Sequence, residues 1–136
     1  MPDYSTTFTA DETIKCTQKE FKTLCRSLGI KKPESIDDEE ALRATHEESA
    51  LSIEFYPKES DLYVYGEQDA SLDVIPTKFI KELGKVLKLQ GRKFLEFGIA
   101  YTCSRTCPGS HGGDTFRITD SGKLVMAERS WPKLQG

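Results

Sequence analysis

The residues best suited to chemistry in this chain lie close together, between Cys103 and Asp114. Cys103, Cys107 and His111 follow one another at intervals of four residues, and thiolates and imidazoles are ligands that zinc prefers. Structural zinc sites need four ligands, so a further residue would have to complete the site. The fourth ligand would be Cys16, His46, Asp114 or a water molecule. The segment is therefore a candidate zinc site, although its spacing is unusual for a zinc loop.

The same side chains fit a second chemistry, which is nucleophilic catalysis by a cysteine. Cys107, or Cys103, would act as the thiolate, and His111 would act as its general base. Arg105 would lower the pKa of the thiol, and backbone amides of the glycines would form an oxyanion hole. Asp114 is the one nearby carboxylate that could orient the imidazole. This hypothesis describes a cysteine-dependent hydrolase or transferase.

A third interpretation is that the loop binds a ligand without catalysis. Hydroxyl, guanidinium and imidazole groups donate to phosphates and carboxylates, and glycines let a ligand approach the backbone closely. The residues of this site would be Ser104, Arg105, Thr106, Gly109, Ser110, His111, Gly112 and Gly113. The simplest alternative is that these residues only form turns in a long hairpin connection. Loops of this length are often functional, which favours the binding site.

These alternatives favour a small binding protein over an enzyme. We expect a non-catalytic regulator, inhibitor or sequestering protein that needs no cofactor. Its segment 102–114 would contact a protein partner or a small anionic ligand. The alternative is the thiol and imidazole site, either with zinc as its cofactor or with Cys107 and His111 as catalytic residues.

A second candidate surface lies on a helix that is expected to begin near Pro76 and to end at Gln90–Gly91, because proline suits a first helical turn. Apolar residues form one stripe along this helix, and basic residues form a stripe on the opposite side. The basic stripe consists of Lys78, Lys81, Lys85 and Lys88. Such a stripe is usually only solvated, but it could also contact an acidic partner or a phosphate.

Two further helices are expected before residue 50. Thr17 and Glu20 form a capping box ahead of an apolar pattern with helical spacing, which predicts a helix at about 18–28. An acidic cluster then predicts a helix at about 37–46, because carboxylates are favourable at the positive end of a helix dipole. His46 would lie at the end of this second helix, where an imidazolium is favourable.

Alternation of apolar and polar residues predicts strands in the rest of the chain. The strands are expected at 51–56, 62–65, 94–103, 115–119 and 123–127. Short turns between them favour antiparallel pairing. The sequence therefore predicts an α+β fold, with one mainly antiparallel sheet of about five strands and about three helices packed on it.

Three tyrosines, Tyr56, Tyr63 and Tyr65, fall on the polar face of the first predicted hairpin. An aromatic stripe on a sheet can stack nucleic-acid bases. The acidic residues beside these tyrosines, Glu54 among them, would repel phosphates, however. We therefore favour packing of the rings across the strands over binding of nucleic acid.

The length of 136 residues indicates a single domain, 1–136. The segment 130–136 is expected to be loose, and 1–12 is either loose or a short strand with a turn at 10–12. The chain has no apolar run of the roughly 20 residues that a membrane helix needs, and its start does not resemble a secretion signal. These features favour a cytoplasmic protein with reduced cysteines that does not enter a membrane.

The net charge of −3 conceals an asymmetry along the chain. Residues 1–75 contain 8 basic and 17 acidic residues, whereas residues 76–136 contain 11 basic and 5 acidic ones. The simplest interpretation is that the two halves pack together and attract each other. The alternative is a bipolar surface with separate acidic and basic patches for different partners.

Overall fold

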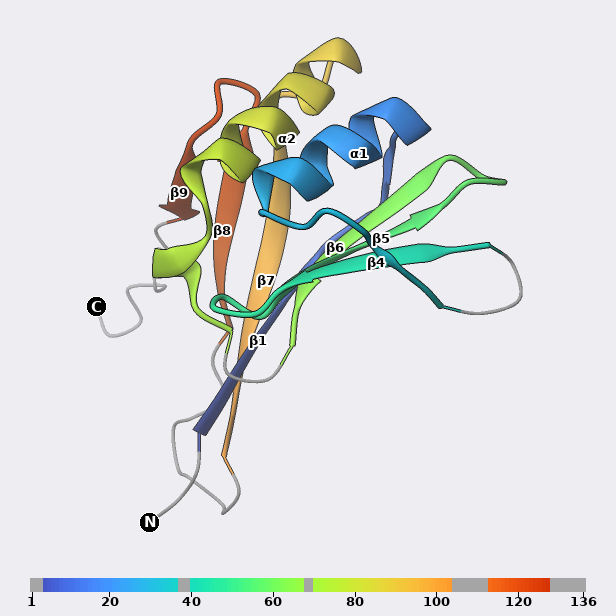
Figure 1. Ribbon diagram of the computed structural model, residues 1–136. Helices are drawn as coiled ribbons and strands as arrows, with labels where there is room; N and C mark the ends of the chain where they lie inside the picture. Colours follow the sequence, from blue (N-terminus) through green and yellow to red (C-terminus); the bar gives the residue numbers. More distant parts are fainter. Residues whose placement is uncertain (1–3, 37–39, 68–69, 104–112, 128–136) are drawn as a thin grey trace.

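The computed structural model describes residues 4–36, 40–67, 70–103 and 113–127. Two helices lie side by side on one face of a large antiparallel sheet (Figure 1). They are α1 (Gln18–Ser27) and α2 (Thr77–Leu89), and a short 3₁₀ helix, η1 (Leu72–Val74), precedes α2. The expected α+β class with a mostly antiparallel sheet is confirmed.

The sheet has nine strands in the described part of the chain, and every pair of neighbours is antiparallel. The order is β3-β4-β5-β6-β1-β7-β8-β9, and β2 pairs with β6. The bounds are β1 (Tyr4–Ala10), β2 (Ile14–Lys15), β3 (Glu34–Ser35), β4 (Leu42–His46), β5 (Leu51–Tyr56), β6 (Asp61–Gly66), β7 (Phe94–Cys103), β8 (Gly113–Thr119) and β9 (Leu124–Ala127). The sequence predicts about five strands and about three helices, whereas the described residues form nine strands and two α-helices.

The core lies between the helices and one face of the sheet, because apolar residues alternate with polar ones along the strands. Phe8, Phe97 and Phe116 from three neighbouring strands contact one another there, with ring centroids 4.5–5.9 Å apart. Phe21 of α1 stacks on Phe55 of β5 at 5.0 Å. These ring contacts join the strands at the centre of the sheet and attach α1 to it.

Helix α2 approaches the turn between β8 and β9 at Gly84. A β-carbon at this position would come within 2.8 Å of the backbone oxygen of Thr119 and of the backbone nitrogen of Gly122. Gly122 itself has a φ of 82°, which is the left-handed region that favours glycine. The helix can therefore lie this close to the turn only because Gly84 has no side chain.

The first helix was predicted correctly, because its signals are local. The backbone nitrogen of Glu20 donates to the Thr17 hydroxyl at 3.1 Å, and the backbone nitrogen of Thr17 donates to the Glu20 carboxylate at 2.9 Å. Both hydrogen bonds of the capping box are present, and α1 begins directly after Thr17.

The helix expected at 37–46 is wrong. Residues 42–46 form β4, which pairs with β5 from Leu42 opposite Phe55 to His46 opposite Leu51; residues 37–39 lie outside the described ranges. The prediction relied on the acidic cluster and overlooked the alternation of Leu42 and Ala44 with polar residues. Backbone pairing with β5, and burial of Ala44, outweigh the dipole argument for a helix.

His46 therefore does not lie at a helix end. Its Nδ1 lies 2.8 Å from the hydroxyl of Ser49, in the turn that leads from β4 to β5. The Ser49 hydroxyl also accepts from the backbone nitrogen of Leu51 at 3.2 Å. His46 has a structural role in this turn.

The N-terminal segment is more regular than expected. Residues 4–10 form β1, which lies between β6 and β7 near the centre of the sheet. The turn expected at 10–12 is not a hairpin, because β1 and β2 both pair with β6. Phe8 of β1 lies opposite Gly66, and Ile14 of β2 lies opposite Leu62, so the chain advances six residues where β6 advances four. The connection 11–13 therefore contains a bulge with two extra residues.

Candidate functional site

The loop that carries the strongest chemical signals lies outside the described residues. Cys103 is the last residue of β7 and Gly113 is the first of β8, and these two strands are antiparallel neighbours. The predicted site residues Ser104, Arg105, Thr106, Cys107, Gly109, Ser110, His111 and Gly112 all lie between them. The binding, zinc and thiol interpretations of this loop stay predictions.

The two cysteines in the N-terminal half are buried and free of disulfide bonds. Burial raises the pKa of the Cys16 thiol to about 12 and that of the Cys25 thiol to about 11, so both are neutral near pH 7. In the described ranges no three His, Cys, Asp or Glu side chains come close enough to hold a metal ion.

The basic residues of α2 contribute to a groove between the two helices. Lys78, Lys81 and Lys85 line one side of it. Arg26 of α1 lies on the other side, together with the hydroxyl residues Thr23 and Ser27. The fourth residue of the predicted stripe, Lys88, does not line this groove. We call it the basic groove, and define it by Arg26, Lys78, Lys81 and Lys85.

The antiparallel packing of the helices produces this convergence. The last turn of α1, with Arg26, lies beside the first turns of α2, with Lys78 and Lys81. The stripe on α2 follows from the sequence alone, but the addition of Arg26 depends on how the helices cross. The one available signal was the position of Arg26 on the polar side of α1, at the end of the capped helix.

Most cations of the basic groove have no acidic partner among the residues that the structure describes. Lys85 forms an ion pair with Glu82 at 3.1 Å, one turn earlier on the same helix. Within the described part of the chain, Arg26, Lys78 and Lys81 form no ion pair. Like charges that gather in one cleft raise the local potential, which favours an anion there.

The basic groove continues into an apolar stretch at the other end of α2. The apolar residues that line this part are Leu24, Val86 and Leu89. Two cations and two carboxylates lie among them: Lys19, Lys85, Glu20 and Glu82. Leu89 is 79% exposed, more than any other large apolar side chain that the structure describes. The whole surface between the helices thus combines a cluster of cations with an apolar end.

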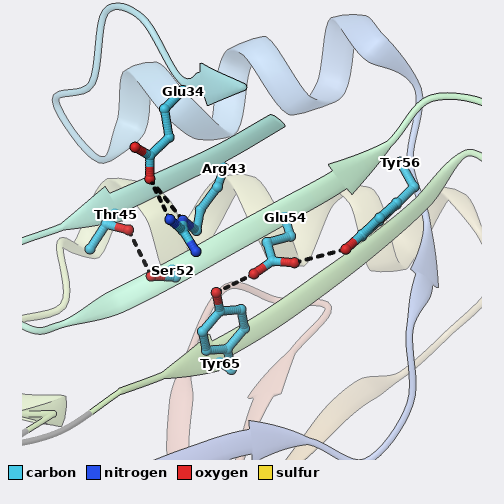
Figure 2. A network of polar contacts seen from close by, with 7 residues as sticks. All are labelled: Glu34, Arg43, Thr45, Ser52, Glu54, Tyr56 and Tyr65. Atoms are coloured by element: carbon cyan, nitrogen blue, oxygen red, sulfur yellow. Dashed lines mark hydrogen bonds and ion pairs between the residues drawn. The ribbon is translucent and has the colours of Figure 1, made fainter. Parts of the chain in front are cut away.

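The opposite face of the sheet is different in character. On β4, β5 and β6 its polar groups satisfy one another (Figure 2). The Tyr56 hydroxyl donates to Glu54 at 3.0 Å, and the Tyr65 hydroxyl donates to the second oxygen of Glu54. Burial, and then the hydrogen bond to Glu54, raise the pKa of Tyr65 to about 12.

Neighbouring side chains extend this network of pairs. The Nη2 and Nε atoms of Arg43 each lie 2.8 Å from Glu34 Oε1, and the Thr45 and Ser52 hydroxyls are 2.8 Å apart (Figure 2). The Tyr56 and Tyr63 rings pack edge to face, with centroids 5.2 Å apart. Packing of the tyrosines across the strands is therefore confirmed for this pair.

Comparison of the chain with models of known protein families, with curated proteins and with solved structures found no significant match. No helix within the described ranges is both long and apolar enough to cross a membrane.

Proposed function

We propose that this chain is a non-catalytic binding protein that captures an acidic segment of a protein partner in the basic groove. The observation that carries the proposal is the convergence of Arg26, Lys78, Lys81 and Lys85 on one groove, where Glu82 is the only carboxylate among the described residues that line it. Three of these four cations form no ion pair within the described residues, so an incoming carboxylate would not have to displace a partner from them.

The shape of the surface favours a chain segment over a small anion. From Lys78 to Leu89 the basic groove and its apolar continuation follow twelve residues of α2, or about 16 Å at 1.5 Å per step. A bound segment of several residues would place its carboxylates along the cations and an apolar side chain on Leu89 and Val86. Such apolar anchors generally contribute most of the affinity, whereas the charges contribute rate and specificity.

The segment 102–114 is our proposal for a second contact. Arg105, Ser110 and His111 have the donor groups that an anionic partner needs. The alternative for this loop, a zinc or thiol site, makes a separate prediction. A zinc site would appear as about one metal ion per chain in elemental analysis of the purified protein, with Cys103 and Cys107 protected from alkylation.

The basic groove can be tested with a fluorescein-labelled acidic peptide in which a leucine follows every three glutamates. Fluorescence anisotropy should show binding that weakens strongly between 50 and 300 mM salt, because exposed charges are screened. The double variant Lys78→Gln/Lys81→Gln should bind at least tenfold more weakly. Lys58→Gln, on the turn between β5 and β6, is the matched control and should bind as the unmodified protein does.

Two further probes separate the proposal from its competitors. A duplex DNA of 20 base pairs presents negative charge on a nucleic acid, and vesicles with 30% phosphatidylserine present it on a membrane surface. If either binds more tightly than the peptide with the same dependence on Lys78 and Lys81, the partner is not an acidic protein segment. The proposal would also be refuted if the double variant bound the peptide as tightly as the unmodified protein does.

A further inference from the structure

The flank of α1 that faces away from α2 borders a second pocket. Five residues of α1 line it, at the spacing of a single helical face, from Gln18 to Arg26. The connection 30–33 and Leu42 of β4 close the other side. The pocket exists because this connection runs back along the helix toward β3, and residues 42–46 form a strand beside it.

The floor of this pocket is apolar. Phe21 and Cys25 come from the buried side of α1, and Ile30, Pro33 and Leu42 are half-buried around them. The Cys25 thiol is neutral near pH 7, because burial raises its pKa, so it adds no negative charge. The floor is therefore suited to a hydrocarbon chain or ring.

The rim of the pocket is cationic. Lys22, Arg26 and Lys31 all line it and are exposed, and none of the described residues that line it is a carboxylate. None of the three forms an ion pair within the described residues. A ligand with an apolar body and one negative group would thus have its body on the floor and its charge at the rim.

We propose that this pocket binds a small amphipathic carboxylate, with a single ring or a short hydrocarbon chain as its apolar part. The size of the pocket limits this part, since the pocket holds about 170 Å³. That is slightly more than the engineered cavity of about 150 Å³ that holds benzene in another protein. The proposal does not depend on the function of the basic groove, because Arg26 is the only residue that lines both.

The probe for this proposal is 4-phenylbutyrate, and its uncharged amide is the matched control ligand. Isothermal titration calorimetry should show one site per chain, with a dissociation constant on the order of 0.1 mM, as expected for a ligand of this size. The amide should bind at least fivefold more weakly. Equal binding of acid and amide, or no binding of the acid, would overturn the proposal.

Two pairs of substitutions locate the site. Lys22→Gln/Lys31→Gln changes only this pocket and should weaken binding of the acid at least tenfold. Lys78→Gln/Lys81→Gln changes only the basic groove and should leave the affinity for the acid unchanged. If the second pair weakens binding of the acid and the first does not, the ligand occupies the groove and the proposal fails.

A measurement on the unmodified protein guards against misfolded variants. In methyl-labelled protein, 4-phenylbutyrate should shift the NMR signals of Ile30 and Leu42, and Val125 on β9 should stay unchanged. Saturable shifts at Ile30 and Leu42 with the acid would support the site directly. Shifts confined to other methyl groups would refute it.

Discussion

The cations on the outer surface of the helices and those on the open face of the sheet differ in how they are paired with carboxylates. On the open face, Arg43 pairs with Glu34 and Arg117 pairs with Glu96 at 3.0 Å. On the helices, Lys85 pairs with Glu82. The other cations of the basic groove and of the pocket beside α1 have no ion pair within the described residues. These arginines of the open face are thus neutralised by carboxylates of the same face, whereas the helical surface is suited to an external anion.

The largest expected effect contrasts the two faces of β7. Phe97 is fully buried in the ring cluster, whereas Phe94 is 41% exposed and contacts the Arg117 guanidinium at 4.2 Å from its ring centroid. Phe97→Ala should lower the free energy of unfolding by about 3–5 kcal/mol. Phe94→Ala should lower it by less than about 1 kcal/mol, since it removes an exposed cation–π contact. Urea denaturation measures both, and similar losses would contradict the assignment of the faces.

A second contrast concerns two glycines. Gly84→Ala would bring a methyl group within 2.8 Å of the backbone at Thr119 and Gly122, whereas a β-carbon at Gly98 on the open face has no neighbour within 4 Å. Gly84→Ala should destabilise the protein by about 1–3 kcal/mol through overpacking, despite the better helix propensity of alanine. Gly98→Ala should be neutral or slightly stabilising, because it lowers the entropy of the unfolded chain. A stable Gly84→Ala variant would show that α2 is not held against the turn.

The smallest effect concerns the network around Glu54. The pKa of Tyr65 is raised to about 12, above its ordinary value of 10. Since the raised pKa stabilises the neutral phenol in the folded state, this contribution is present below pH 10 and is lost as the pH rises toward 12. Absorbance at 295 nm should therefore show a late phenol titration that is missing in Tyr65→Phe. Ionisation of that phenol near pH 10 would contradict the burial of Tyr65 and its hydrogen bond to Glu54.

The elements that the sequence predicts correctly have local determinants. The capping box at Thr17 and Glu20 predicts α1, and the alternation of apolar and polar residues predicts the hairpin of β5 and β6. The lysine stripe of α2 was also readable from its period. These features need only a few neighbouring residues, so a single sequence is enough to predict them.

Most of the features that the sequence does not predict involve partners that are distant along the chain. β4 is the exception, because the alternation of Leu42 and Ala44 with polar residues is a local signal and β5 follows after a short turn. β1, in contrast, depends on β6 and β7 for its place in the sheet. Arg26 joins the basic groove only through the packing of two helices. The pocket beside α1 needs the path of the 30–33 connection, which no local pattern encodes. Tertiary contacts therefore determine the positions of β1, of Arg26 and of this pocket.

The central position of β1 has a consequence for how the protein is made. β1 joins β6 to β7, and its pairs with β7 connect residues roughly ninety positions apart, such as Phe8 and Ile99. During synthesis, β1 must therefore wait for β7 before it can pair on that side. Contacts of this range slow folding, so the completion of the sheet is expected to set the rate of maturation. A chaperone that holds β1 of the nascent chain would act at this step.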